Sequence, residues 1–182
     1  GFYNILELIK KYEVKNFIFA SSSSVYGGRK DLPFNEEDKV DKPISFYAAT
    51  KKSNEILAYS YSHLYKIPMT GLRFFTVYGP WGRPDMALFK FTKAILSDKP
   101  IKLYNYGHMI RDFTYIDDVI EILTKTIFKI PKTNSSSNKS KPVTLLKSAP
   151  YKIFNIGNNS PTSVLVYLET IEKHLDKKAI KK

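Results

Sequence analysis

The chain has 182 residues, of which 43% are hydrophobic and 14% aromatic. Such a chain can bury a real core in one domain or slightly more, which excludes wholesale disorder. No apolar run approaches the roughly 18 residues that a membrane-spanning helix needs, so we expect no membrane partner, and we expect no signal peptide. The chain has no cysteine, which excludes disulfides and thiolate chemistry and leads us to expect a cytoplasmic protein.

The formal net charge of +12 has three candidate sources. An AT-rich coding sequence would enrich Lys together with Asn, Ile, Tyr, Phe and Ser, all of which are abundant along the chain. A site for anionic metabolites or a nucleic-acid surface would also need basic residues. The lysines are scattered rather than gathered in one stripe, so we favour the coding bias and expect no nucleic-acid partner.

Helix-like and strand-like segments alternate along the first half of the chain. Apolar residues at helical spacing predict a helix before residue 13, and "KNFIFASS" reads as a short buried strand. A polar, proline-bounded loop over 35–43 follows, and a second helical pattern extends from Ser45 to about Tyr65. The segment "IPMTGLRFF" predicts another buried strand, which ends at the Gly- and Pro-rich loop "YGPWGRP".

The second half of the chain continues this alternation. Asp85 is placed to cap a helix that runs to about Leu96, and "PIKLYNYG" and "RDFTY" look like short strands before a helix over about 116–128. Residues 131–150 form a low-complexity stretch, which we predict to be a flexible surface insertion. "YKIFNIG" is the last predicted strand, and Pro161 is expected to open the final helix.

Strands separated by helices predict an α/β fold in which helices pack on a parallel sheet. No Gly-rich phosphate-binding loop, of the form GxxGxxG or GxxxxGKS/T, follows any of these strands. The chain begins inside a predicted helix and stops just after another, in a lysine-rich run. We therefore expect that segments of the complete protein are missing at both ends.

Tyr47 and Lys51 are four residues apart, so a helix would place them on the same face. The spacing alone is common, and a packed tyrosine beside a solvated lysine is its ordinary explanation. The surroundings favour a site instead, because a hydrophobic strand ends in the four serines Ser21 to Ser24 a short distance before this helix. A second strand and a Gly/Pro loop then follow it.

Five stretches resemble the NAD-dependent epimerase/dehydratase family of extended short-chain dehydrogenase/reductases. They are "NFIFASSSSVYG", "SFYAATKKSNE", "GLRFFTVYGPWGRPDMALFKF", "IRDFTYIDDVIE" and "YKIFNIGNNSP", and they span nearly the whole chain in order. Within the family the chain looks most like bacterial UDP-glucuronate 4-epimerases of surface-polysaccharide pathways. The resemblance implies the later half of a Rossmann-like doubly wound parallel sheet in residues 1–75, and a smaller α/β substrate-binding region in residues 76–182.

The resemblance also implies the catalytic roles. Oxidation of a sugar hydroxyl needs a base while hydride passes to NAD, and a free phenol, with a pKa near 10, is a poor base at neutral pH. A nearby ammonium and the positive nicotinamide favour the phenolate. Tyr47 is then the base, Lys51 tunes it and binds the NAD ribose, and Ser22 hydrogen-bonds the reacting hydroxyl. Ser21 and Phe75 are expected beside the cofactor.

Ser23 and Ser24 bear on the type of reaction. Relatives that dehydrate sugars carry Asp-Glu at these positions, because elimination of water needs a second acid/base pair. Ser-Ser therefore favours epimerisation at C4 through a transient 4-keto sugar, from UDP-glucuronate to UDP-galacturonate. UDP-glucose is the alternative substrate, since no single residue decides between the two sugars. The two serines are expected to contact the sugar or diphosphate, or only to satisfy the turn.

The second region carries further matches to substrate-binding positions of the family. Thr76 is expected to face the hexose, and Arg83 to contact a sugar carboxylate or the diphosphate, unless it is an ordinary solvated loop residue. Ala87 and Phe89 match positions that line the uridine pocket, although at helical spacing either could be a core residue.

Tyr104 and Arg111 complete the predicted substrate-binding set. Tyr104 matches the aromatic that stacks on uracil, with a core position as the alternative, and Arg111 matches the arginine that clamps the diphosphate. Asp112 is expected to be structural. The three histidines of the chain are isolated and lack metal-ligand spacing, so we predict no metal site.

Two hypotheses of different class remain from the sequence. Family members carry a GxxGxxG turn that holds the NAD diphosphate, and a C-terminal section that completes the nucleotide pocket, and neither is present here. In the first hypothesis the chain represents an NAD-dependent epimerase, homodimeric through a four-helix arrangement of the helices that start near Gly1 and Ser45. In the second it is a truncated, inactive fragment or pseudo-enzyme. We expect these 182 residues alone to be inactive and to expose an apolar sheet edge.

Overall fold

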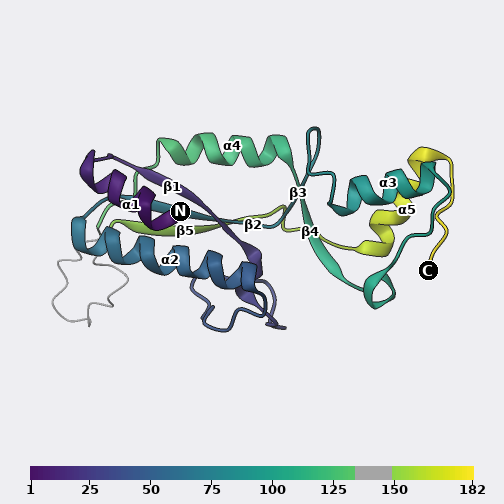
Figure 1. Ribbon diagram of the computed structural model, residues 1–182, viewed down its shortest axis with the longest axis horizontal. Coiled ribbons are helices and arrows are strands. Elements are labelled where there is room, and N and C mark those ends of the chain that lie inside the picture. Colours follow the sequence, from purple (N-terminus) through teal and green to yellow (C-terminus); the bar gives the residue numbers. More distant parts are fainter. Residues whose placement is uncertain (134–148) are drawn as a thin grey trace. The chain divides into compact units, whose positions relative to one another are not determined.

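A computed structural model describes residues 1–133 and 149–182, which fall into two compact units (Figure 1). The first unit consists of Gly1–Phe74 and Glu121–Ile156, and the second of Phe75–Ile120 and Gly157–Lys182. Most of the predicted insertion over 131–150 lies outside the described residues, so its predicted flexibility stays a prediction.

The first unit is built around a three-stranded parallel sheet. In chain order its elements are α1 (Phe2–Lys11), β1 (Phe17–Ser22), the 3₁₀ turn η1 (Ser23–Tyr26), α2 (Phe46–Tyr65), β2 (Met69–Phe74), the later part of α4 (Ile116–Ile127) and β5 (Tyr151–Ile156). The strand order is β1-β2-β5, and both pairings are parallel. Parallel neighbours need a crossover connection, which α2 provides between β1 and β2.

Apolar side chains hold α1 and α2 against one face of this sheet. Leu6 of α1 and Ala58 of α2 are fully buried, and they join Phe19 of β1 and Met69 of β2 in one core cluster. Figure 1 shows the Glu121–Ile127 part of α4 on the opposite face. Helices on both faces of a parallel sheet are the arrangement of Rossmann-like folds, so the predicted α/β fold class is confirmed.

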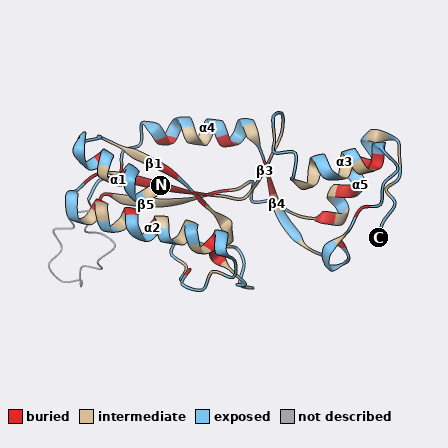
Figure 2. Ribbon diagram, in the orientation of Figure 1, coloured by how far each residue is buried: buried red, intermediate tan, exposed pale blue. Residues whose placement is uncertain are grey.

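The central strand β2 is buried from Met69 to Arg73 (Figure 2). Central strands of parallel sheets are covered on both faces and usually read as continuous apolar runs. Arg73 interrupts that run with a charge, and a buried charge needs a partner.

A smaller sheet of mixed direction forms the second unit. Its elements are β3 (Thr76–Tyr78), α3 (Ala87–Leu96), the 3₁₀ turn η2 (Tyr104–Gly107), β4 (Ile110–Tyr115), the start of α4, β6 (Pro161–Ser163) and α5 (Val164–Leu175). β4 pairs in parallel with β3 and antiparallel with β6. A second core cluster joins α3 to α5 through Ile95, Leu168 and Ile171, together with Ile101.

None of the helices described in either unit combines the length and the apolar character needed to cross a membrane.

For one segment, the two compact units divide the chain differently from the predicted boundary at residue 75. The sequence predicts a single region over 76–182, whereas Glu121–Ile156 belongs to the first unit. The reason is that β5 pairs with β2 from Met69 opposite Tyr151 to Phe74 opposite Ile156. A strand joins the sheet that its backbone pairs with, however far apart the two strands lie in sequence. The segment "PIKLYNYG" is also not a strand, since it makes only an isolated bridge at Ile101 before η2.

Two predicted helix starts are displaced. Met86 rather than Asp85 precedes the first turn of α3, and the Asp85 carboxylate instead accepts two hydrogen bonds from Arg83. Pro161 begins β6, not the final helix. That helix starts after Ser163, whose hydroxyl oxygen accepts from a backbone N–H of the first turn and so caps α5.

Truncation of the fully buried Leu168 should expose how much the second unit depends on its core cluster. We expect Leu168→Ala to lower the free energy of unfolding by about 2–5 kcal/mol, because a buried leucine leaves a cavity that neighbours fill only in part. Leu96→Ala is the matched control, since Leu96 is exposed at the end of α3, and should cost no more than about 0.5 kcal/mol. Urea unfolding curves measure both, and equal losses would contradict this packing.

Candidate active site

The serine run forms a turn at the carboxyl end of β1. The backbone N–H of Ser24 donates to Ser22 Oγ at 3.2 Å, and the Ser24 hydroxyl donates to the same oxygen at 2.9 Å. Gly27 ends the turn with φ = 64°, and a Cβ there would lie 2.5 Å from the Lys42 carbonyl oxygen, so only glycine fits without strain. Ser22, Ser23 and Ser24 are each half-buried. Three hydroxyls are thereby gathered at the edge of the sheet where parallel α/β folds bind ligands.

Tyr47 and Lys51 lie on α2 beside this edge. Ser45 caps the helix by accepting from the backbone N–H of Ala48 at 3.1 Å, which places Tyr47 in the first turn with 55% of its surface exposed. Lys51 Nζ lies 5.8 Å from the centroid of the Tyr47 ring and donates to the Ala20 carbonyl oxygen of β1 at 3.1 Å. The lysine therefore attaches the helix to the strand two residues before Ser22.

Ser21 points away from this group into a buried ion pair. Its hydroxyl donates to Glu55 Oε1 at 2.6 Å, and the same carboxylate accepts from Arg73 Nε at 2.8 Å and Arg73 Nη2 at 3.0 Å. Arg73 is 2% exposed and Glu55 3% exposed. The side chain of Ser21 is committed to this network, so a contact of Ser21 with a cofactor would have to use its backbone.

The guanidinium of Arg73 also reaches the far end of the serine turn. Arg73 Nη1 donates to Tyr26 Oη at 2.9 Å, and Tyr26 Oη lies 2.8 Å from Asn155 Oδ1 on β5. The Tyr26 ring stacks on Phe34 with centroids 4.4 Å apart. Burial raises the pKa of Tyr26 and outweighs the opposing effect of Arg73, so the phenol stays protonated and can donate.

Arg73 and Ser21 keep the Glu55 carboxyl ionised despite its burial. Burial by itself raises the pKa of the Glu55 carboxyl, but the hydrogen bonds from Arg73 and Ser21 and the arginine charge outweigh it. The net pKa lies below the ordinary value of 4.5, and the carboxylate is ionised at neutral pH. This pair was not predicted from the sequence. Its signals were a charge inside the apolar strand "MTGLRFF" and an acid four residues after Lys51.

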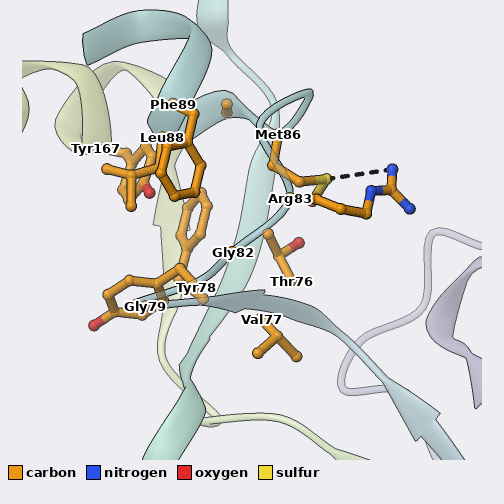
Figure 3. Close-up of a pocket in the computed structure, with 12 residues that line it drawn as sticks. Thr76, Val77, Tyr78, Gly79, Gly82, Arg83, Met86, Leu88, Phe89 and Tyr167 are labelled. Atoms are coloured by element: carbon orange, nitrogen blue, oxygen red, sulfur yellow. Dashed lines mark hydrogen bonds between the residues drawn. The ribbon is translucent and has the colours of Figure 1, made fainter. Parts of the chain in front are cut away.

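A small apolar pocket lies in the second unit between β3, the loop after it and α3 (Figure 3). Four of the predicted substrate-binding residues line it, namely Thr76, Arg83, Ala87 and Phe89, and Tyr167 of α5 contributes to its wall. The cavity measures about 20 Å³, which is room for one water molecule and not for a sugar. The structure thus brings these four residues together around a pocket too small for a sugar.

Arg83 already has an anionic partner in this arrangement. Its Nε and Nη2 each donate to Asp85 at 2.8 Å, and Figure 3 shows its side chain beside the Met86 sulfur. The pair is largely exposed, with 72% of the Arg83 side chain and 59% of the Asp85 side chain accessible. A substrate anion would have to compete with Asp85 for this guanidinium.

Tyr104, Arg111 and Phe75 lie outside the pocket lining. Tyr104 is exposed at the start of η2, with Lys102 Nζ 5.4 Å from its ring centroid. Arg111 on β4 donates to the Ile110 carbonyl oxygen at 2.9 Å, and no carboxylate of the described residues pairs with it. Its charge is therefore available to an anion. Phe75 lies beside Gly157, where an added Cβ would come 3.4 Å from its ring.

Asp112 has a structural role, as expected. Its two carboxylate oxygens accept from the backbone N–H groups of Asn158 and Asn159 at 3.1 and 3.0 Å, which fixes the loop before β6. In the described parts of the chain no three His, Asp or Glu side chains are grouped as metal ligands would be.

Comparison with known proteins gives matches along the whole chain. The profile of the NAD dependent epimerase/dehydratase family matches residues 1–141. Protein CapI of Staphylococcus aureus is 55% identical over 181 residues, covering 100% of this chain and 54% of that protein. A probable UDP-glucuronate 4-epimerase of Rhizobium meliloti is 48% identical over 181 residues, covering 99% of this chain and 53% of that protein.

A solved structure agrees with these matches. The UDP-glucuronic acid 4-epimerase from Bacillus cereus, in complex with UDP-glucuronic acid and NAD, superposes with a TM-score of 0.81 at 35% identity. The superposition covers 100% of this chain and 52% of that chain. The chain therefore spans about half the length of the relatives it matches.

Removal of Arg73 should destabilise the first unit far more than removal of an exposed arginine. Arg73→Met leaves the Glu55 carboxylate buried beside only Ser21 and Lys52, and we expect a loss of about 3–5 kcal/mol in the free energy of unfolding. Arg83→Met breaks an exposed pair with similar geometry and should cost less than about 1 kcal/mol. Chemical denaturation at neutral pH compares them, and a small loss in Arg73→Met would show that the buried pair is dispensable.

Proposed function

Because the chain belongs to the NAD dependent epimerase/dehydratase family, we propose that the protein it represents inverts C4 of UDP-glucuronate to give UDP-galacturonate. One observation carries the proposal. Lys51 is fixed to β1 beside the serine turn, with its ammonium near the exposed Tyr47 ring. The similarity to UDP-glucuronate 4-epimerases of Rhizobium meliloti and Bacillus cereus supports this choice of substrate.

The proposed proton chemistry uses three side chains of the first unit. The exposed Tyr47 is the proposed base that takes the proton of the C4 hydroxyl, and the Lys51 ammonium lies close to its ring. Ser22 Oγ hydrogen-bonds the same hydroxyl and holds it toward the base. After the 4-keto sugar has turned over, the hydride would return to the opposite face of C4, and Tyr47 would give the proton back to the C4 oxygen.

NAD is the proposed cofactor, and the donor set around Lys51 fits it. An ammonium has three N–H donors, and within the described residues Lys51 uses one of them to bind the Ala20 carbonyl oxygen. The other two can hold ribose hydroxyls, while the exposed Tyr47 faces the reacting end. When bound, NAD supplies the reversible acceptor for the hydride from C4.

Ser23 and Ser24 support epimerisation over dehydration. Elimination of water needs a second acid and base next to the reacting carbon, and Ser23 and Ser24 supply neither a carboxyl group nor an imidazole for this role. In the second unit, Arg111 is the proposed ligand of the diphosphate because it has a charge without a carboxylate partner among the described residues. The exposed ring of Tyr104 is the proposed stacking surface for uracil.

Homodimerisation through α1 and α2 is also proposed. Both helices expose large apolar side chains, including Ile5 and Leu8 on α1 and Ile56 and Leu64 on α2, which a four-helix contact would cover. A monomeric mass in sedimentation equilibrium would contradict this.

We further propose a cytoplasmic location, because a chain without cysteine gains no disulfide from an oxidising compartment.

Replacement of the proposed base tests the function directly. Tyr47→Phe in the protein at its full encoded length, supplied with NAD, should lower the conversion of UDP-glucuronate to UDP-galacturonate by about 10²–10⁴-fold. The phenyl ring keeps its packing and cannot accept the proton. Separation of the two sugar nucleotides by chromatography measures the rate.

Tyr65→Phe is the matched control, because Tyr65 is the last residue of the same helix and its hydroxyl contacts only the exposed Lys10 among the hydrogen bonds resolved. It should turn over at the rate of the unchanged protein. Equal rates in the Tyr47 variant and the unchanged protein would refute the base. Faster conversion of UDP-glucose would reassign the substrate, and no conversion of either sugar would favour the inactive-fragment hypothesis.

A further inference from the structure

We propose that the buried Arg73–Glu55 pair positions the reacting side chains, by fixing the serine turn relative to Tyr47 and Lys51. Neither Arg73 nor Glu55 touches the proposed reacting atoms, so both are positioning residues. This inference rests on the proposed function for its catalytic consequence, whereas its structural consequence can be measured without any turnover.

Glu55 lies on α2 one turn after Lys51, on the face that carries the two proposed reacting residues of this helix. Tyr47, Lys51 and Glu55 follow one another at intervals of four residues, so they share one face of the helix. Two of the three are tied to the same short stretch of β1. Lys51 donates to Ala20, and Glu55 accepts from Ser21 at 2.6 Å. The rotation of α2 about its axis is thereby set against the strand at two successive turns.

Residues of β1 and β2 meet at the same carboxylate. Ser21 of β1 lies opposite Arg73 of β2 in the parallel register, and both side chains donate to Glu55. The guanidinium binds through two nitrogens at 2.8 and 3.0 Å, a geometry that fixes orientation as well as distance. One carboxylate therefore joins α2 to two neighbouring strands at the edge where the serine turn begins.

The third nitrogen of Arg73 controls the other end of the turn. Nη1 donates to the hydroxyl of Tyr26, the last residue of η1, and the guanidinium carbon lies 4.9 Å from the centroid of that ring. Ser22, Ser23 and Ser24 are the only residues between Ser21 and Val25-Tyr26, and both flanking side chains, Ser21 and Tyr26, bind the pair. The serine turn is thus held at both ends by the same buried group.

Stability alone is a poor explanation for such a pair. Apolar residues of similar volume often stabilise a protein as much as a buried ion pair or more, because both charges must lose their water. Apolar contacts, however, do not fix the relative orientation of the groups they join, as hydrogen bonds do. A directional group matters beneath a reacting centre, since a displacement of about 1 Å can lower a rate by about 10²-fold.

A double variant separates positioning from stability. Glu55→Leu combined with Arg73→Met removes both charges together and leaves no unpaired charge in the core, so the protein should remain folded by circular dichroism. We expect faster amide hydrogen exchange in residues 22–26, with exchange in α1 and β5 unchanged. In the protein at its full encoded length, kcat for UDP-glucuronate should fall by about 10²-fold with KM within about threefold.

Two further variants complete the experiment. Tyr26→Phe keeps the ring and removes the hydroxyl that binds Arg73, Asn155 and the Asn35 carbonyl, so it should also speed exchange in residues 22–26, with a smaller fall in kcat. Glu172→Gln is the control, because Glu172 is a buried carboxylate of the second unit that binds Ala179 and Lys178. It should alter neither the exchange of residues 22–26 nor kcat.

The outcomes are distinguishable from those of the proposed function. An unchanged protein without epimerase activity would refute the proposed function, and exchange in residues 22–26 would still decide whether the pair fixes the turn. A folded double variant with unchanged exchange there would overturn the positioning role, whatever its kcat. Faster exchange with unchanged kcat would overturn its catalytic consequence.

Discussion

The buried contact between Arg73 and Glu55 is the constraint on which the first unit depends. A guanidinium in the middle of a central strand must find an anion inside the protein, because the cost of an unpaired buried charge exceeds what the surrounding packing can offset. Glu55 is that anion, and the need to meet it sets how α2 lies on β1 and β2. The remaining donors and acceptors then draw in Ser21 and Tyr26.

The residues proposed for catalysis and for substrate binding belong to two units, each with its own sheet. The first unit carries the residues proposed for acid/base chemistry, at and beside the carboxyl end of β1 in a parallel sheet. The second carries the residues proposed to bind the nucleotide sugar, on a smaller mixed sheet and the segments around it. The proposed function assigns both sets to one reaction of the complete protein, and this chain spans about half the length of the relatives it matches.

The sequence predicted the local elements of the first unit well and its long-range pairings poorly. The helix α1, the buried strands β1 and β2 and the helix α2 from about Ser45 all follow from short apolar patterns. The destination of β5 does not, because a strand pattern states which face is apolar and not which sheet receives it. Around Tyr104 the local prediction itself was wrong. The sequence predicts a strand, whereas the structure has a 3₁₀ turn that contains two residues with left-handed backbone conformation.

For the candidate site, the sequence by itself determined which reactive side chains are present and how they are spaced within each element. A serine run after a strand and a Tyr-Lys pair on one helix face are local facts, and they survive in any fold that keeps the two elements. Only the tertiary structure decided that Ser22 belongs to the open edge while Ser21 is buried, and that Arg73 meets Glu55 rather than another of the acids nearby in sequence. Neighbouring strand residues point to opposite faces, and which partner each face meets depends on pairings between distant segments.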